Sequence, residues 1–486
     1  MKTLRKKVNV CIITTAVLIF CGLLNTANAQ NLESIKPKIE EVLNTAVELD
    51  LFSGCVLVAK GNEVLFSGAY GEANKDFHIM NTLDTKFNIA SVTKTFTSVS
   101  IMLLVQNGLI SLNDPVTKYL SDFPFGDKIT IFHLLTHTSG LGHYTQEYAE
   151  KKHQIRGFYD FLNLFIYKEK LLFEAGTKFQ YSNSGVIVLG AIIEKVSGLK
   201  YSDYLEQNIF APLNMKNTCN KMPEEIIENR ASGYTRKLSG GFFETSLSIS
   251  PPTSATGLRT TVHDLFTFFQ AVHSNNLLKQ EYKEIMFTPY LKDGKDPYAL
   301  LWEVLDGGFY FKSNNPVIGH SGFQPGFMSA CFYYLENKYT LILLTNYSDG
   351  HIVFKPIEAI LLDKEYKLPR ISVNSFLYSY VQENSFNSII NNLNNILEKN
   401  HYTISSPYTL NRLGYSLIHE GELALAIKFF ILNVELFNDN ANTYDSLAEA
   451  YMKNDQKELA IKNYEKSLEL NPENENAKEM LLQLRN

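Results

Sequence analysis

The chain has 486 residues, 45% of them hydrophobic and 20% charged, with a formal net charge of -6. This is ordinary globular composition, and the length suggests two to three domains with ample core. The acidic balance gives no case for nucleic-acid binding, so no nucleic-acid partner is expected.

Residues 1–29 have the pattern of a secretory signal peptide. Four basic residues precede an apolar run over 8–24, and Ala27-Asn28-Ala29 offers a cleavage site after Ala29. The segment carries +4, so the mature chain would be at -6 - 4 = -10. We therefore expect export to the periplasm or cell surface of a bacterium. The apolar run is long for a signal peptide, so an uncleaved membrane anchor stays open as the alternative. Lipid attachment at Cys21 is disfavoured by the bulky Phe20 before it.

Three cysteines, Cys55, Cys219 and Cys331, remain after the signal segment. An odd number in a chain of this size predicts no disulfide framework. We expect them to be buried as small hydrophobic residues.

In chain order, the hydrophobic pattern predicts a helix over 31–49 and a hairpin with strands 55–58 and 64–66. Helices follow over 91–107, 129–135, 158–167, 186–196 and 261–272, and a second hairpin has strands 327–335 and 339–345. Strand signals at both ends of 50–350, with helices between them, predict an α+β fold. The expected architecture is an antiparallel sheet flanked by helices, with a helical insertion and a cleft between the two.

The composition changes near Pro369, and a 34-residue repeat follows. The first unit has Leu410, Leu413, Gly414, Ala426 and Phe430, which recur as Tyr444, Leu447, Ala448, Ala460 and Tyr464. This large-small-large pattern resembles the tetratricopeptide (TPR) helix-turn-helix repeat. The expected domains are a signal peptide over 1–29, a main domain over 30–367, a helical linker over 368–403 and a C-terminal α-helical repeat domain over 404–486. Two units are few for a free array, so we expect capping by neighbouring helices or docking on the main domain.

The tail also predicts a partner. Residues 404–486 hold 8 basic and 13 acidic residues, and 8 - 13 = -5. An acidic repeat groove favours basic or apolar segments of a protein partner. The alternative is that the tail only stabilises or dimerises the main domain.

Ser91 and Lys94 are the first candidate catalytic pair. Three residues apart on a helix, they share one face. A serine hydroxyl needs a neighbouring base to become a nucleophile. Free lysine titrates near pH ~10.4, so it serves as that base only in a desolvated, cation-rich site.

Two further motifs follow in order: Tyr181-Ser182-Asn183 and His320-Ser321-Gly322. With Ser91-x-x-Lys94, they resemble the serine β-lactamase-like superfamily, which holds class C β-lactamases, D-Ala-D-Ala peptidases, D-aminopeptidases and esterases. The resemblance covers roughly residues 50–350 and extends to the flanking segments 87–90, 133–141 and 319–323.

The resemblance implies a role for each motif residue. Ser91 would be the nucleophile, Lys94 its proton acceptor and Tyr181 the partner that carries the proton to the leaving group. Asn183 would hold Lys94 and the substrate amide. The catalytic residues implied are Ser91, Lys94, Tyr181 and His320, and the substrate-binding residues are Asn183, Ser321, Gly322 and Phe323. The backbone N–H groups of Ser91 and Phe323 would form the oxyanion hole.

Some residues depart from the family pattern or point elsewhere. His320 stands where many relatives carry Lys, and a neutral histidine holds a substrate carboxylate less well. This favours peptidase or esterase relatives over efficient β-lactamases. His133 and His137 are four apart, but no H-E-x-x-H arrangement is present, so we expect a structural or loop-shaping role and no metal. No phosphate-cradling glycine loop is present, and no cofactor is expected.

Two functions remain open from the sequence. The first is an exported serine hydrolase that forms an acyl-enzyme on D-amino-acid peptides, small esters or β-lactams. The second is a penicillin- or peptide-binding sensor or scaffold with little turnover, which signals through the TPR tail.

Overall fold

The computed structural model describes residues 35–142, 151, 154–155, 157–168, 170–245, 251–290, 298–307, 309–311 and 316–485. The predicted signal peptide lies outside these residues. The chain divides into two compact units: unit 1 is Met1–Thr235 with Glu244–Pro369, and unit 2 is Arg236–Phe243 with Arg370–Asn486. Within the described ranges, no helix is both long and apolar enough to cross a membrane.

Unit 1 is built on a six-stranded sheet in the order β2-β1-β12-β11-β10-β9. Its strands are β1 (Gly54–Lys60), β2 (Glu63–Tyr70), β9 (Glu303–Leu305), β10 (Val317–Gln324), β11 (Phe327–Tyr334) and β12 (Tyr339–Thr345). The central pairings are antiparallel, and β1 from the start of the unit lies against β12 from its end. Strands from the start and the end of unit 1 therefore pair in one sheet, as the sequence predicts. Smaller pairs are formed by β3 (Glu72–Asn74), β4 (Ile79–Met80), β5 (Phe87–Asn88), β6 (Tyr234–Arg236), β7 (Phe242–Glu244) and β8 (Arg259–Thr260).

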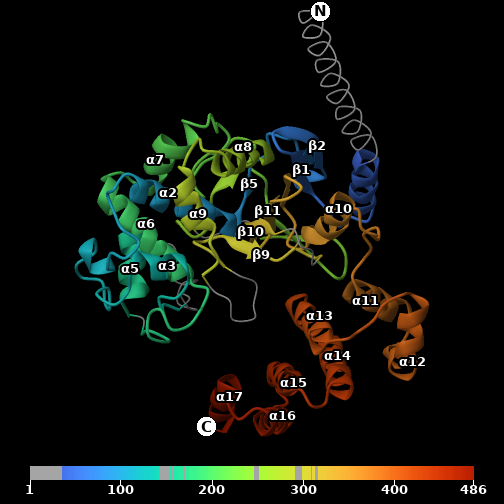
Figure 1. The fold of residues 1–486 in the computed structure, drawn as a ribbon. Helices are drawn as coiled ribbons and strands as arrows, with labels where there is room; N and C mark the ends of the chain where they lie inside the picture. The colour runs from blue at the N-terminus through green and yellow to red at the C-terminus, as the bar shows by residue number, and fades with distance from the viewer. Residues whose placement is uncertain are drawn as a thin grey trace, which may run out of the picture. The chain divides into compact units, whose positions relative to one another are not determined.

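Helices cover the sheet and form the insertion (Figure 1). Residues 35–48 are helical, and the insertion holds α2 (Thr93–Gln106), α3 (Ile131–Leu135), α5 (Phe158–Leu164), α6 (Asn183–Ser197) and α7 (Tyr201–Leu205). After it come α8 (Val262–His273), α9 (Gln280–Phe287) and α10 (Phe354–Leu361). Short turns of other helix types are η1 (Ala90–Val92), η2 (Val116–Lys118), η4 (Ile166–Lys168), η5 (Glu206–Phe210) and η7 (Gly350–Val353). Both α8 and α10 pack against β12, and every residue of β12 is buried.

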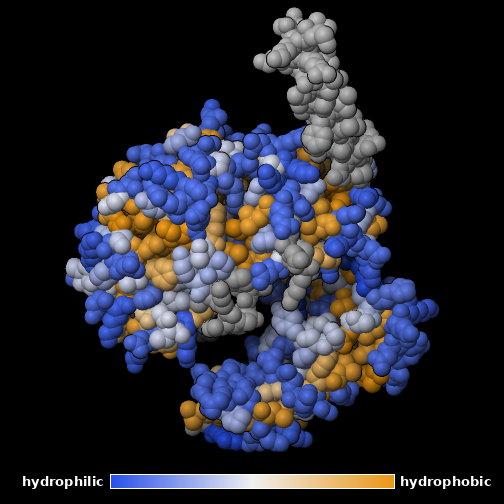
Figure 2. Space-filling model, viewed as in Figure 1, coloured by the Kyte–Doolittle hydropathy of each residue, from blue (hydrophilic) through white to orange (hydrophobic). Residues whose placement is uncertain are grey.

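The α2 helix is the centre of unit 1. Its residues from Thr93 to Met102 are all buried, and it packs against α6 and α9. Its sequence is apolar or small nearly all round because no side of it faces water. Hydrophobic residues also gather in patches between hydrophilic ones on the drawn face of unit 1 (Figure 2). Cys55 and Cys331 are buried and Cys219 is partly buried, and all three thiols are free.

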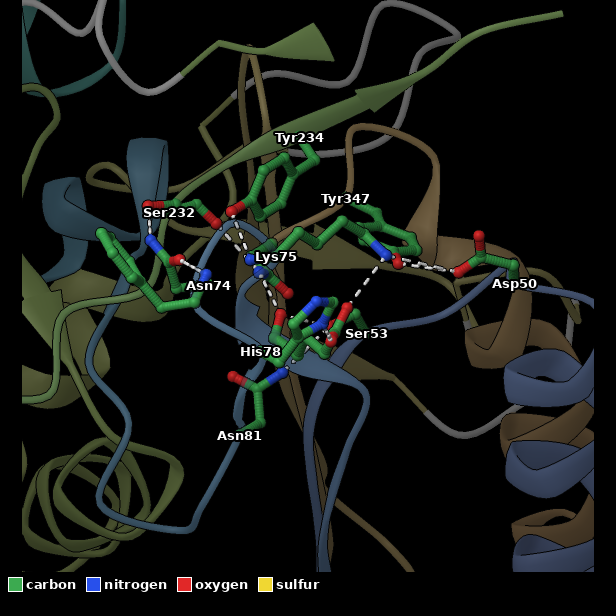
Figure 3. A network of polar contacts seen from close by, with 12 residues as sticks. Asp50, Ser53, Asn74, Lys75, His78, Asn81, Ser232, Tyr234 and Tyr347 are labelled. Atoms are coloured by element: carbon green, nitrogen blue, oxygen red, sulfur yellow. Dashed lines mark hydrogen bonds and ion pairs between the residues drawn. The ribbon is translucent and has the colours of Figure 1, made fainter. Parts of the chain in front are cut away.

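A polar network ties the first and last strands of unit 1 to the segments around them (Figure 3). Lys75 forms ion pairs with Glu72 and Asp50 and lies over the ring of Tyr347. The Lys75 N–H donates to Tyr234 Oη at 2.7 Å, and Tyr347 Oη–H donates to Asp50 at 2.9 Å. These bonds join segments more than 150 residues apart, so they fix the closure of the sheet that carries the site.

Unit 2 is helical. It contains α11 (Val373–Glu383), α12 (Phe386–Lys399), α13 (Pro407–His419), α14 (Leu423–Leu436), α15 (Ala441–Lys453), α16 (Lys457–Leu470) and α17 (Glu475–Arg485). The close approach of α13 and α14 requires Gly414, where an added Cβ would lie 2.4 Å from the Phe430 ring. Residues of α11 and α12, predicted as a linker, share one core with α13 and α14. Glu420 accepts hydrogen bonds from the backbone of Leu238 and Ser239, so the segment Arg236–Phe243 packs within this unit.

Candidate active site

Ser91 and Lys94 meet where a short turn enters a long helix. Lys94 Nζ lies 3.0 Å from Ser91 Oγ, a hydrogen-bonding distance. The sequence predicts the helix from Ser91, but α2 begins two residues later, and Ser91 lies in the 3-10 turn η1. The reason is Ala90, whose φ of 44° is unusual for a residue with a side chain. Its N–H donates to Asn88 Oδ1 at 2.9 Å, which holds the turn that presents Ser91.

Lys94 is fully buried, and this sets its chemistry. Its Nζ also donates to the backbone oxygen of Ala255 at 2.7 Å. Burial lowers the pKa of Lys94 from 10.5 to about 7, and the charge of Glu303 opposes that shift. Near neutral pH much of Lys94 is therefore an uncharged amine, the form that can take the Ser91 proton.

Tyr181 lies beside Lys94. Lys94 Nζ is 5.0 Å from the centroid of the Tyr181 ring. The centroid of the His137 ring is 4.5 Å from that of Tyr181, and the two ring planes are tilted relative to each other. The Tyr298 ring lies 6.3 Å from Tyr181 in an edge-on arrangement. The structure thus brings Ser91, Lys94 and Tyr181 together and adds two residues that the motifs do not contain.

A chain of hydrogen bonds runs behind Tyr181 and fixes the tautomers of two histidines. The Ser182 N–H lies 3.2 Å from His137 Nδ1, and since a backbone N–H can only donate, that nitrogen accepts. His137 Nε2 then carries the proton and faces Tyr298 Oη at 3.3 Å. Tyr298 Oη–H in turn donates to His320 Nε2 at 3.0 Å. His320 Nδ1–H is left to donate to the Ser321 backbone oxygen.

Burial favours the uncharged form of His320, and the charge of Glu303, whose Oε1 lies 3.3 Å from His320 Nδ1, opposes it. Burial lowers the pKa of His320, and burial raises that of Tyr298 well above its usual value, so Tyr298 stays a phenol that can donate. The His320 side chain is only 2% exposed and points toward Tyr298. The sequence places His320 on the cleft wall as a catalytic residue; the structure places its ring beneath that wall.

Tyr298 and Glu303 reach the site from one tight turn. They form an antiparallel bridge, and Leu301 between them has a φ of 60°. Ser98 of α2 secures the turn, since its hydroxyl donates to the Leu300 oxygen at 2.5 Å and accepts from the indole N–H of Trp302 at 3.1 Å. Glu303 Oε1 accepts from the Ser321 N–H at 3.1 Å and from the Ser321 hydroxyl at 2.9 Å.

β10 carries Phe323, whose N–H is expected to form part of the oxyanion hole. β9 pairs only with Val317–Gly319, so in the described chain the following residues of β10 have no strand on that side. Because β9 is short, β10 is an edge strand only beyond Gly319. The Ser321 N–H points to the β9 side, and so does the Phe323 N–H two residues later, because strand residues alternate. An added Cβ on Gly322 would lie 2.9 Å from Ser91 N, so glycine is needed for this close approach.

Asn183 departs from expectation in one predicted bond, and His133 and His137 make separate contacts with the backbone. Asn183 begins α6, and its buried Oδ1 has no hydrogen-bond partner among the described residues, so the predicted bond to Lys94 is not made by that oxygen. His133 accepts from the Thr130 N–H in a capping box, while His137 lies in the chain behind Tyr181. Across the residues that the structure describes, no group of three or more His, Cys, Asp or Glu side chains forms a potential metal site.

The sequence motifs missed three polar residues of the site: His137 as a neighbour of Tyr181, and both Tyr298 and Glu303. The available signal was weak. Glu303 is an acid directly after the apolar run Ala299–Trp302, and Tyr298 directly precedes that run. Neither position belongs to a recognisable spacing with Ser91.

The sheet, the insertion and the Ser91–Lys94 pair define a serine hydrolase-type protein of β-lactamase fold. The chain belongs to the Beta-lactamase family, which residues 41–362 match, and residues 441–474 match the tetratricopeptide repeat. It is 30% identical over 357 residues to penicillin-binding protein 4* of Bacillus subtilis strain 168, covering 68% of this chain and 77% of that protein.

Solved structures show the same fold. The penicillin-binding protein from Bacillus halodurans is 28% identical with a TM-score of 0.59, covering 65% of this chain and 99% of that one. The D-amino acid amidase from Ochrobactrum anthropi SV3 is 26% identical with a TM-score of 0.56. The match covers 67% of this chain and 99% of the amidase chain. The predicted fold class and the predicted TPR resemblance are thereby confirmed.

Proposed function

We propose that the chain is a serine hydrolase that forms an acyl-enzyme at Ser91 from amide or ester substrates. The observation that carries this proposal is the 3.0 Å contact between Ser91 and a buried lysine. Similarity to a penicillin-binding protein and to a D-amino acid amidase supports it, since an amidase, by its name, cleaves amide bonds.

The proposed reaction follows from the site. Ser91 Oγ attacks the carbonyl carbon while its proton passes to Lys94 Nζ. The oxyanion accepts hydrogen bonds from the N–H groups of Ser91 and Phe323, each worth on the order of 3 kcal/mol. The bond to the leaving group then breaks, and Tyr181 relays the proton from Lys94 to the leaving atom. Water attacks the ester with the same groups as base, which frees Ser91.

The test is hydrolysis of p-nitrophenyl acetate by the wild type, Ser91→Ala and Lys94→Arg. Both variants should lose at least about 1,000-fold in kcat, because the nucleophile or the titratable base is gone. Ser121→Ala, at an exposed serine, is the matched control and should keep full activity. Full turnover by Ser91→Ala would rule the proposal out.

The appended helical unit favours a second candidate, a sensor that binds covalently with little turnover. Unit 2 has a core of its own, which acyl transfer does not need. The same assay separates the two, because a sensor releases one equivalent of nitrophenol and then stops.

Export is part of the proposal and rests on the basic and apolar pattern of residues 1–29. A basic or apolar protein segment remains the proposed partner of the acidic tail.

A further inference from the structure

Glu303 lies where the ladder between β9 and β10 stops. It is the first residue of β9 and pairs with Gly319, the last residue of β10 in that ladder. Its carboxylate then takes the N–H of Ser321, which a longer β9 would have taken. The Glu303 side chain is 20% exposed, so solvent reaches the acid, and its Oε1 also lies 3.3 Å from His320 Nδ1.

In the proposed reaction, the leaving group of a substrate is on the side of the site that Ser321 and Glu303 form. Tyr181, which the proposed reaction uses to protonate the leaving atom, adjoins Tyr298, and Tyr298 bonds His320 next to Ser321. Phe323, the proposed oxyanion donor, is two residues further along β10 and has an exposed ring, and the proposed reaction puts the acyl chain on that side. Ser321 and Glu303 therefore face the group that departs.

Glu303, Ser321 and His320 offer a ligand mainly hydrogen-bond acceptors. The single hydroxyl proton of Ser321 is donated to Glu303, which leaves only lone pairs on its oxygen for a ligand. His320 Nε2 accepts from Tyr298, and its Nδ1–H is used by the Ser321 backbone oxygen. A carboxylate placed here would meet the like charge of Glu303, whereas an ammonium or amide N–H would find an acceptor.

We propose that Glu303 selects the leaving group, so that the site cleaves amides and esters whose leaving group is neutral or cationic and disfavours those whose leaving group carries a carboxylate. The inference rests on the proposed acyl-enzyme function. It sets primary amides and amino-bearing esters or amides above peptides that end in a free carboxylate.

Three thioesters with one acyl group, N-acetyl-D-alanyl, test this. Their leaving groups are thioglycolate, thioglycolamide and thiocholine, which carry negative, no and positive charge; the quaternary ammonium of thiocholine cannot capture the acyl group. The wild type should show kcat/KM at least about tenfold lower for the thioglycolate ester than for the other two at low salt, and added salt should shrink the gap. This ranking needs no variant. A preference for thioglycolate would overturn the proposal.

Glu303→Gln keeps the shape and an acceptor but removes the charge. The ratio of kcat/KM for the thiocholine ester to that for the thioglycolate ester should fall by about tenfold or more. Glu63→Gln, at the start of β2 on the opposite edge of the sheet, should leave the ratio unchanged. If the ratio is unchanged in Glu303→Gln while thiol release still requires Ser91, the proposed selection by Glu303 is overturned and the proposed function stands. Thiol release that survives Ser91→Ala overturns the proposed function and this inference with it.

Discussion

Replacing Lys94 with Met should stabilise unit 1 in a manner that depends on pH. Lys94 is fully buried, and burial lowers its pKa from 10.5 to about 7. The difference, 10.5 - 7 = 3.5, at ~1.36 kcal/mol per pH unit corresponds to about 5 kcal/mol of instability when the lysine is charged in both states. Holding a buried lysine next to Ser91 therefore lowers the free energy of unfolding of unit 1.

The sign follows from proton binding. Between pH 7 and 10.5 the unfolded chain keeps the lysine proton while the folded protein has lost it. The unfolded state thus binds more protons, and the stability of the wild type rises with pH in this window. Met has no proton to lose, so its advantage over Lys should shrink from about 5 kcal/mol at pH 6 to about 2 kcal/mol at pH 9.

Urea denaturation measures this difference at the two pH values. The single tryptophan of the chain, Trp302, is buried in unit 1, so its fluorescence reports the unfolding of that unit. Lys195→Met, at an exposed position of α6, is the control and should show no such pH dependence. A Lys94→Met advantage that is equal at pH 6 and pH 9 would refute the argument that burial depresses the Lys94 pKa.

Three further predictions concern the same site. The kcat/KM of the wild type for a neutral ester should rise with pH through about 7, as Lys94 loses its proton, and a flat profile from pH 5 to 9 would contradict its role as base. Tyr298→Phe removes the donor to His320 and should lower kcat by about 10- to 100-fold with little change in KM, measured by steady-state kinetics. Gly322→Ala places a Cβ 2.9 Å from Ser91 N and should cost at least about 100-fold in kcat/KM, so activity within twofold of wild type would argue against an oxyanion hole at this approach.

Local spacing made part of the site predictable. Ser91 and Lys94 are three residues apart, so their proximity follows from one turn of chain, whether it is α or 3-10. The TPR helices were predictable for a similar reason, because a small residue such as Gly414 recurs at a fixed period opposite a large one such as Phe430. The sheet followed from alternating apolar runs at both ends of unit 1.

Long-range geometry was not predictable in the same way. Tyr298 lies 161 residues from His137, and Glu303 lies 18 residues from Ser321, with no spacing that marks either pair. The positive φ of Ala90 shapes the turn that presents Ser91, and that of Leu301 shapes the turn between Tyr298 and Glu303; neither residue type favours this conformation. The lowered pKa of His320 comes from burial in the folded site rather than from its own motif.

Mass spectrometry of the protein quenched during turnover of a p-nitrophenyl ester tests the central claim most directly. The account predicts a mass increase equal to one acyl group, located by peptide mapping on Ser91, that forms on mixing and disappears when the ester is exhausted. An acyl group on another residue, or steady hydrolysis with no acylated protein even in rapidly quenched samples of a deacylation-slowed ester, would contradict an acyl-enzyme at Ser91.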